Sequence, residues 1–476
     1  MASWWLELER ELEREAGGVA AGGGECHALS ASAFAEGVCA SGALAEALAS
    51  HDWVSVPRLP FPLLLDRPVV LSSGQRLSVH PETVVRLLPG CGGVMVRNRH
   101  PFDGRRCASV GGCGDHDLCV EGGVWEEAGS GVSPHDDSPE MQAFGRSRLT
   151  LRDGEGRETN VAGSEGGGGM LLGVLFFSAA RRVTVRGLTI RRCRFYGVLM
   201  SGCDHFVVED VRFERNGMDG VHVNGPSSHG LIQRLSGKTG DDFVALNAWD
   251  WWLSAVSFGP IHHMLVRDLD SDGDELRLLP GRKTYAGGAQ VACPIHDCVC
   301  RRVRNIYCVK LYQQPNCAND LTGQRDCSDI PGELSRIAFL DVDFGVLREV
   351  GLGEVPVNAL FEVAVDASDL HLEGIRVAQP AEAFRAAGRR LVEVGPKSST
   401  WKRGHGDPAQ WAELFDTEMV CRAERLAIRD VAFAGVPCRD RDLLAGCHAL
   451  RPNPDYPRTT PRGGHGYGVL SGLELD

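Results

Sequence analysis

One short pattern of apolar and polar positions recurs along the chain. An alternating apolar half, a polar or Gly corner and a second apolar pair occur at residues 182–190, 205–213, 336–344, 369–377 and 425–433, with looser copies at 117–125 and 264–270. Period-2 alternation of β-branched and aromatic residues predicts strands. The first two copies begin 23 residues apart, which suits one coil of a β-solenoid. The pattern therefore predicts an all-β fold, a single right-handed parallel β-helix.

A β-sandwich is the competing fold. It requires hairpin signals between adjacent strands, and few such signals occur. The 59 glycines agree better with the many tight corners of a solenoid, because glycine adopts positive φ without a Cβ penalty.

The first 48 residues differ from the rest. Residues 4–15 have the pattern of an amphipathic helix, and residues 31–49 form a second helical stretch rich in Ala. We expect residues 1–48 to form a helical cap on the first coil, because an open solenoid end exposes apolar core and unpaired backbone. Residues 49–476 are then the β-helix domain with lateral loops. A dimerisation helix is the alternative, and an oligomer could form through this helix or through the solenoid ends.

Net charge and composition limit the kinds of partner and location that the sequence predicts. A net charge of -13 argues against nucleic acid, whose binding requires clustered Lys and Arg. The chain has no run of ~18 apolar residues, so no membrane span is predicted. It has no basic start followed by an apolar run, so no export signal is predicted. The 17 scattered cysteines favour free thiols in a reducing compartment. These features predict a cytoplasmic location.

Three aspartates are spaced by about one coil. Asp219 precedes Asp241 by 22 residues and Asp242 by 23, so their side chains should lie on neighbouring strands ~4.8 Å apart. Crowded carboxylates raise the pKa of at least one member, and we expect Asp241 to hold the proton. A protonated acid beside ionised bases is what glycoside hydrolysis uses, with ~6.5 to 9.5 Å between the carboxyls of an inverting pair. The alternative is that these aspartates only cap solenoid corners.

In this region the chain resembles glycoside hydrolase family 28, the polygalacturonases. Gly217-Met218-Asp219-Gly220 and Gly240-Asp241-Asp242-Phe243 stand in the order and spacing of the family's Asn-Thr-Asp-Gly and Asp-Asp motifs. The resemblance covers roughly residues 182–281 and implies a parallel β-helix. It also implies that Asp241 is the general acid and that Asp219 and Asp242 activate the water.

Other motifs of the family match less closely. In Glu275-Leu276-Arg277-Leu278-Leu279, Leu279 stands where the family's Arg-Ile-Lys motif has Lys. Arg277 is a candidate for substrate binding, with Arg282 or Lys283 as the missing cation. The family's Gly-His-Gly motif has no counterpart one coil after Asp242. His262 or His263 stands near that distance and is a candidate for orienting the acid.

An aromatic cluster follows the acidic strand. Asn247, Trp249, Trp251 and Trp252 lie within six residues, and apolar sugar faces stack on aromatic rings. We expect these residues to line a sugar subsite. A hydrophobic clamp over the solenoid side is the alternative.

Two groups of Cys and His have the ligand types of structural zinc. They are Cys107, Cys113, His116 and Cys119, and Cys293, His296, Cys298 and Cys300. Neither has paired Cys-x-x-Cys spacing, and strand residues two apart, such as Cys298 and Cys300, face the same side and fit the core. No metal and no cofactor is therefore predicted.

The sequence thus predicts an inverting glycoside hydrolase acting on an oligosaccharide or polysaccharide, with action from the chain end as one option. A polysaccharide lyase on the same fold and a non-catalytic carbohydrate-binding solenoid are the alternatives.

Overall fold

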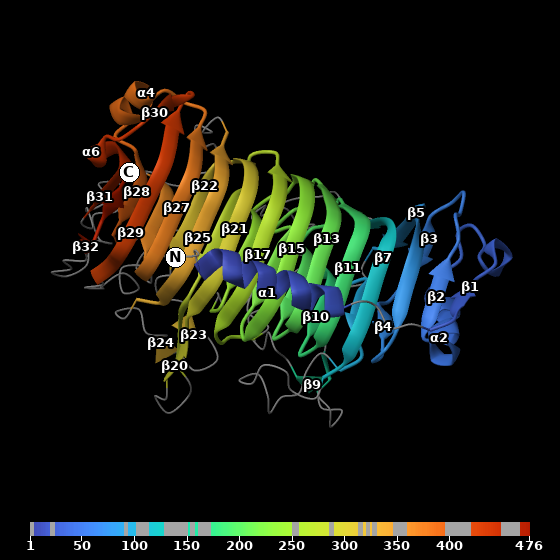
Figure 1. The fold of residues 1–476 in the computed structure, drawn as a ribbon. Helices are drawn as coiled ribbons and strands as arrows, with labels where there is room; N and C mark the ends of the chain where they lie inside the picture. Colours follow the sequence, from blue (N-terminus) through green and yellow to red (C-terminus); the bar gives the residue numbers. More distant parts are fainter. Residues whose placement is uncertain are drawn as a thin grey trace.

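Parallel strands stack in chain order along one axis (Figure 1). The computed structural model describes residues 4–19, 24–89, 94–100, 114–127, 151–152, 158–159, 173–249, 257–284, 290–312, 318–319, 324–325, 331–345, 359–395, 420–448 and 467–476. Within these residues the strands form two large sheets. Between Val69 and Phe433, strands from the two large sheets alternate along the chain, as expected when each coil contributes one strand to each sheet.

The larger sheet has 16 described strands, parallel except for one short antiparallel strand at its end. In chain order these are β1 (Cys26–Ala28), β2 (Trp53–Val56), β3 (Leu63–Leu65), β5 (Arg76–Leu87), β7 (His116–Glu127), β11 (Arg181–Arg191), β13 (Asp204–Glu214), β15 (Ser227–Lys238), β17 (Ile261–Ser271), β21 (Ile295–Ile306), β25 (Glu333–Phe344), β27 (Asp366–Val377), β29 (Val420–Phe433), β30 (Val436–Pro437), β32 (Tyr467–Ser471) and β33 (Glu474–Leu475).

The second sheet has 11 described strands. They are β4 (Val69–Leu71), β6 (Val96–Asn98), β10 (Gly173–Ser178), β12 (Tyr196–Ser201), β14 (Val221–Asn224), β16 (Asp242–Asn247), β18 (Glu275–Leu279), β22 (Cys308–Tyr312), β26 (Ala359–Ala364), β28 (Arg390–Val394) and β31 (Ala445–Cys447). Small antiparallel pairs join β8 (Leu151–Arg152) to β9 (Glu158–Thr159), β19 (Gly281–Thr284) to β20 (Gln290–Cys293), and β23 (Ala318–Asn319) to β24 (Gln324–Arg325).

The repeated segments of the sequence all fall in the larger sheet and align with one another. Val183 pairs with Phe206, and farther along Ile337 pairs with Leu370, which pairs with Leu426. These positions belong to one continuous hydrophobic core. The predicted parallel β-helix is therefore confirmed.

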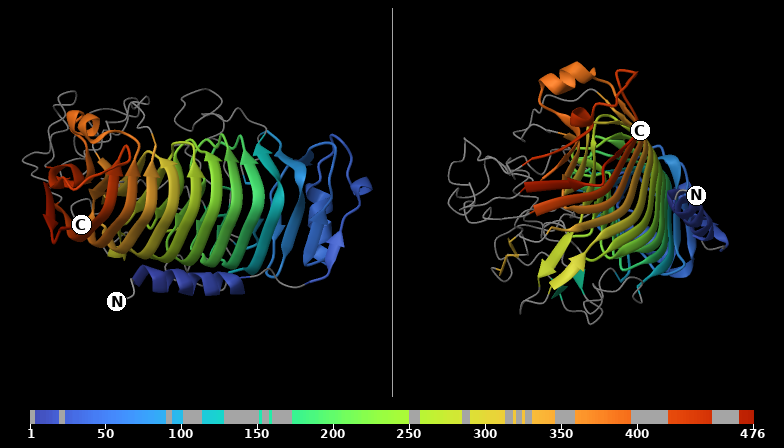
Figure 2. Two further views of the ribbon diagram at one scale, coloured as in Figure 1. Left: turned by 45° about the horizontal axis from the view of Figure 1, so that its top comes forward. Right: turned by 60° about the vertical axis from the view of Figure 1, so that its left-hand side comes forward.

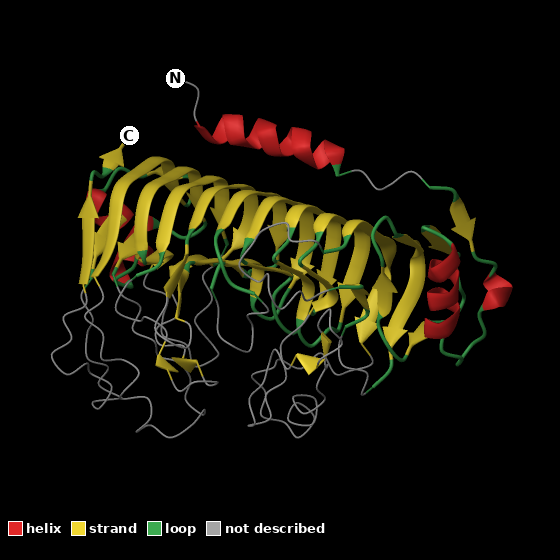
Figure 3. Ribbon diagram, turned by 90° about the horizontal axis from the view of Figure 1, so that it is seen from below, coloured by secondary structure: helices red, strands yellow, loops and turns green. Residues whose placement is uncertain are grey.

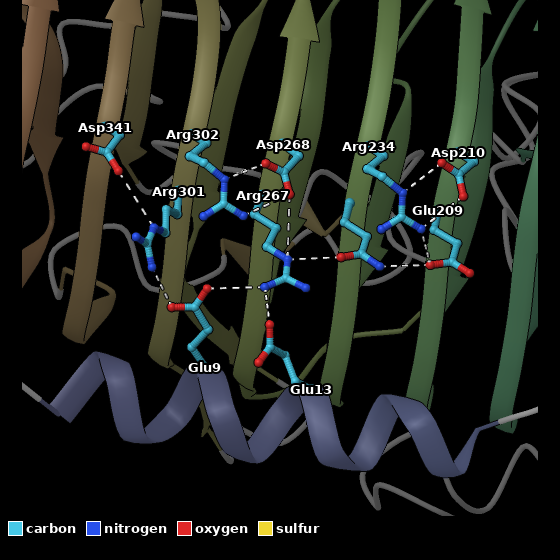
Figure 4. Close-up of polar contacts among 11 residues, drawn as sticks. Glu9, Glu13, Glu209, Asp210, Arg234, Arg267, Asp268, Arg301, Arg302 and Asp341 are labelled. Atoms are coloured by element: carbon cyan, nitrogen blue, oxygen red, sulfur yellow. Dashed lines mark hydrogen bonds and ion pairs between the residues drawn. The ribbon is translucent and has the colours of Figure 1, made fainter.

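Non-glycine residues with positive φ form a ladder across the long strands. Asp210, Arg234, Asp268, Arg302 and Asp341 occupy this backbone conformation in successive coils, with φ between 51° and 56°. Acidic and basic residues alternate, and Arg234 Nε lies 2.8 Å from Asp210 Oδ1 (Figure 4). Asp tolerates positive φ better than most residues, and each arginine balances the charge of the aspartate in the coil before it.

The two main N-terminal helices lie in different places, which corrects the expectation that both cap the first coil. Helix α2 (Ser41–Ser50) lies at the N-terminal end of the stack, where Leu44 and Leu48 join the core (Figure 3). Helix α1 (Trp4–Gly18) instead lies across the outer face of the larger sheet (Figure 2). Short helices η1 (Ala31–Ala33), α4 (Ala381–Ala386) and α6 (Arg441–Leu444) complete the fold, and no described helix is long and apolar enough to cross a membrane.

Helix α1 docks through an apolar stripe flanked by ion pairs. Leu8, Leu12 and Val19 pack with outward-facing apolar residues of five strands, Val207, Leu231, Leu265, Val299, Ala338 and Leu340. Beside this stripe, Glu9 contacts Arg267 and Arg301 (Figure 4). A sheet face this apolar needs a cover, and the amphipathic pattern of residues 4–15 supplies it.

Candidate active site

The three aspartates of the acidic motifs lie on two successive coils of the smaller sheet. Asp219 stands just before β14, and Asp242 begins β16. The amide of Gly220 donates to the carbonyl of Asp242 at 2.9 Å, which fixes one coil on the next. A Cβ on Gly240 would lie 2.3 Å from the carbonyl oxygen of Gly217. Glycine at this position therefore lets the two acidic turns approach closely.

The structure brings the three carboxylates together. One oxygen from each of Asp219, Asp241 and Asp242 lies within 4.8 Å of the other two. Asp219 and Asp242 are 1% and 0% exposed, whereas 23% of the Asp241 side chain is exposed. Only Asp241 of the three can therefore meet a substrate directly.

A buried histidine orients Asp219. His222 Nδ1 lies 2.6 Å from Asp219 Oδ2, and His222 Nε2 lies 3.0 Å from Nδ2 of Asn224. An ionised carboxylate only accepts hydrogen bonds, so Nδ1 donates and Nε2 accepts from the amide. The ring of Tyr196 stacks on the imidazole at a centroid distance of 4.0 Å. His222 is thus fixed in one tautomer that serves Asp219.

Two basic residues compensate the acidic group. Arg277 lies on β18, its side chain is 9% exposed, and its guanidinium contacts both Asp242 and, at 3.3 Å, Asp241. Lys310 is paired with Arg277 in strand register one coil later. It forms an ion pair with Glu275, and its Nζ lies 3.9 Å from Asp242 Oδ1.

Protonation equilibria reflect this packing. Burial raises the pKa of the Asp219 carboxyl, the hydrogen bond from His222 opposes the rise, and the charge of Asp241 adds to it. Burial by itself lowers the pKa of Arg277, but nearby Tyr312, Asp241 and Asp219 outweigh this and raise it above its ordinary value. Arg277 is therefore a permanent cation, and Asp219 is a carboxylate of increased basicity.

A pH prediction follows for His222. In His222→Leu the hydrogen bond that lowers the pKa of Asp219 is lost, so that pKa rises further. If Asp219 must be ionised to activate water, the acidic limb of the kcat/KM profile should move to higher pH. His222→Gln retains an N–H donor and should move the limb less. A profile that is unchanged in His222→Leu would show that Asp219 ionisation does not limit the reaction.

Several residues predicted to bind substrate lie elsewhere. Trp249 is 3% exposed and belongs to the hydrophobic core, where it packs against Gly281, so the expectation that it lines an open subsite is wrong for this residue. Trp251 and Trp252 lie outside the described residues. Arg282 pairs with Glu333 at 2.6 Å on the hairpin that leaves β18. The cation beside the acidic group is Lys310 instead.

Asn247 and His263, which were also predicted to bind substrate, lie on different sheets. Asn247 is buried, and its Nδ2 lies 3.5 Å from His222 Nε2, so it belongs to the network behind Asp219. His263 lies on β17 in the larger sheet, where its Nδ1 is 2.9 Å from that of His262. His263 therefore belongs to a separate histidine cluster on the larger sheet, and the histidine beside the acidic group is His222, which contacts Asp219 and not the expected acid Asp241.

The suspected zinc groups do not assemble among the described residues. Cys298 and Cys300 point into the core, while His296 stacks on His262 at the surface. Burial raises the pKa of the Cys300 thiol to about 12, as expected for an inert core residue. In the other group, Cys119 is buried, and Cys107 and Cys113 lie outside the described residues.

The sequence alone did not single out His222 or Lys310 as site residues. For His222 a usable signal existed. His222 is three residues after Asp219 and alternates with Val221 and Val223, which are in the core, so it had to face the acidic side. Lys310 required the coil register, because 33 residues separate it from Arg277.

Fold and site together define a parallel β-helix with a compensated acidic group on its smaller sheet. No protein-family model and no curated protein matches the chain. The solved family 28 exopolygalacturonase of Yersinia enterocolitica is 10% identical and superposes with a TM-score of 0.50 over 94% of this chain and 78% of that one. This similarity shows a shared fold, as the family resemblance implied.

Two further solved structures are similar at slightly lower scores. An exopolygalacturonase of Thermotoga maritima is 12% identical with a TM-score of 0.49, covering 98% of this chain and 96% of that one. A tailspike protein of E. coli bacteriophage HK620 is 11% identical with a TM-score of 0.48, covering 92% and 61%.

Proposed function

We propose that this chain is an inverting glycoside hydrolase acting on an oligosaccharide or polysaccharide. The observation that carries the proposal is the grouping of three carboxylates within 4.8 Å, of which only Asp241 is exposed. A protonated carboxyl beside ionised carboxylates is the apparatus of glycoside hydrolysis. The name of the Yersinia protein, an exopolygalacturonase, adds a substrate class to test.

The exposure of each carboxylate suggests its role. Asp241 protonates the glycosidic oxygen, because it is the carboxyl that reaches the surface. Asp219 and Asp242 hold and deprotonate the attacking water. Asp219 Oδ1 is buried and accepts no hydrogen bond from the described residues, so it has a lone pair for a water proton. His222 keeps Oδ2 occupied and the carboxylate in place.

The exposure of the three carboxylates favours an inverting mechanism, whereas the distances between them do not. The nearest carboxylate oxygens lie closer together than the ~6.5 to 9.5 Å expected of an inverting pair and resemble the ~5 to 5.5 Å of a retaining pair. A retaining enzyme, however, needs two carboxylates in contact with the sugar. Here two of the three are buried, so they act through a small molecule such as water.

The lyase alternative requires a basic residue that can lose its proton. Arg277 has a raised pKa and is bound to Asp242, and Lys310 is bound to Glu275. The raised pKa keeps Arg277 protonated, and the ammonium of Lys310 is already engaged by Glu275, which disfavours proton abstraction from a uronate by either residue.

The non-catalytic alternative requires the aspartates to cap backbone turns. Asp274 does this, because it accepts from the amide of Thr239 at 3.0 Å and from Ser271 Oγ at 3.2 Å. Asp219 instead binds an imidazole, and Asp242 binds a guanidinium. Among the described residues, neither carboxylate accepts a hydrogen bond from a backbone amide, so turn capping does not explain the position of Asp219 or Asp242.

The deciding experiment follows products by NMR while the purified protein is incubated with uronate and neutral oligosaccharides. We expect the first-formed anomer to have inverted configuration, and single sugars released from the outset would indicate action from the chain end. A product of retained configuration would refute the water-activating roles. An unsaturated uronate would favour the lyase.

A further inference from the structure

Five histidines gather at one corner of the larger sheet, away from the acidic group. His205 and His229 lie on successive coils with φ of 56° and 53°, and their rings stack at a centroid distance of 4.5 Å. His263 follows in the next coil, 5.0 Å from His229, and contacts His262, which stacks on His296. The proposed function uses none of these residues.

Helix α1 brings a carboxylate to this corner. The helix is fixed across the sheet by the contacts of Glu9 and Glu13 with Arg267 (Figure 4). Its C-terminal side is held where Thr184 Oγ1 donates to the carbonyl of Val19 at 3.2 Å. Glu15 therefore has a defined position above β13 and β15.

Three ligand atoms converge there without bonding one another. Glu15 Oε2 lies 3.7 Å from His205 Nε2 and 3.9 Å from His229 Nε2. These distances exceed those of hydrogen bonds. Glu15 Oε2 is itself buried and accepts no hydrogen bond from the described residues.

The opposite sides of both rings face one acid. Asp204 Oδ1 lies 3.2 Å from His229 Nδ1, with which it is hydrogen-bonded, and 2.9 Å from His205 Nδ1. Because an ionised carboxylate only accepts, the hydrogen bond to Asp204 places a proton on Nδ1 of His229, which leaves the Nε2 lone pair of the neutral ring facing Glu15. The Nε2 atoms of His205 and His229 and the Oε2 atom of Glu15 thus converge on one point, which a metal ion can occupy.

The position of Glu15 in helix α1 also favours a cation at this point. Glu15 lies in the last turn of α1, which contains no basic residue. A helix C-terminus carries partial negative charge and favours cations, so an acidic residue there is unfavourable unless a positive charge compensates it.

We infer that Glu15, His205 and His229 bind one divalent transition-metal ion, with Zn²⁺ as the best match, and that this ion fastens α1 to the β-helix. Two imidazoles and a carboxylate form an established zinc ligand set, with water completing the tetrahedron. Asp204 would act as the outer carboxylate that orients metal-bound histidines. Ligand atoms of such a site lie about 3.3 Å apart for bonds of ~2.0 to 2.1 Å. Glu15 Oε2 therefore has to approach each ring by about 0.5 Å, and the two Nε2 atoms, which lie within 4.8 Å of each other, have to turn towards the same ion.

Zinc binding measured by calorimetry on the intact chain tests this inference. The wild type should bind one equivalent that Glu15→Gln and His229→Asn each weaken at least tenfold, because each removes a ligand. Asn suits position 229 because it tolerates the positive φ. Glu11→Gln is the matched control, since it removes the same charge one turn earlier and should retain the affinity.

Hydrogen exchange provides the structural readout. Zinc should slow exchange in α1 of the wild type and of Glu11→Gln but not of Glu15→Gln, with circular dichroism verifying the fold of each variant. Wild-type protein that binds no zinc would overturn the inference and leave an imidazolium as the cation. Binding that survives Glu15→Gln would place the ion on other histidines or on thiols, and equal losses in all three variants would indicate a general charge effect. Both outcomes overturn the ligand assignment.

Discussion

Asp241→Asn should lower the turnover of an unactivated glycoside by roughly 10² to 10⁴-fold while the fold is retained. Asn preserves the shape of the side chain and its place beside Arg277, but it has no proton to transfer to the leaving oxygen. Because the Asp241 side chain is 23% exposed and Asp219 and Asp242 are buried, neither neighbour can reach the glycosidic bond in its place. Steady-state rates on natural oligosaccharides measure the loss.

The diagnostic comparison uses a substrate with a good leaving group. An aryl glycoside needs little protonation, so Asp241→Asn should lose much less activity on it, whereas Asp219→Asn should be impaired on both substrates through weaker water activation. Asp210→Asn, in a surface ion pair of the other sheet, is the control and should leave both rates unchanged. Equal losses on both substrates in Asp241→Asn would contradict the acid assignment, and intact rates would favour a binding protein.

Much of this fold could be predicted from local pattern. The alternation at 182–190 and 205–213 determines which side chains face inward, and the aligned pairing of Val183 with Phe206 follows from the 23-residue spacing. The same spacing predicted that Asp219 and the Asp241–Asp242 pair would lie on neighbouring coils. Period-2 geometry makes such predictions robust, because a slip of one residue would turn every apolar side chain outward.

Contacts that depend on long-range packing could not be predicted in this way. The amphipathic pattern of residues 4–15 requires an apolar partner but does not say whether that partner is the end or the side of the solenoid. Helix α1 packs on the side because Val207, Leu231 and Leu265 face outward there. Trp249 has a ring on which a sugar can stack, yet its side chain is buried against Gly281. Lys310 emerged only once the register placed it beside Arg277.

Arg277→Met should lower the free energy of unfolding by about 3 to 5 kcal/mol at neutral pH, the usual cost of leaving a buried charge without its partner. Arg277 contacts Asp242 and Asp241, and its charge also lowers the pKa of Asp219. Without it the folded-state pKa of Asp219 rises further above that of the unfolded chain. A carboxyl with a raised folded-state pKa contributes stability at low pH that is lost as pH rises through that pKa, so the deficit of the variant should shrink towards about pH 4.

Urea unfolding of Arg277→Met at acidic and neutral pH measures this deficit. Arg282→Met is the matched control, because its ion pair with Glu333 is partly exposed and should contribute no more than ~1 kcal/mol. Adding Asp242→Asn to Arg277→Met removes one of the uncompensated charges and should recover part of the loss. A deficit that stays the same at both pH values, with no recovery in the double variant, would mean that Arg277 stabilises the coil by packing and that the acidic group does not depend on its charge.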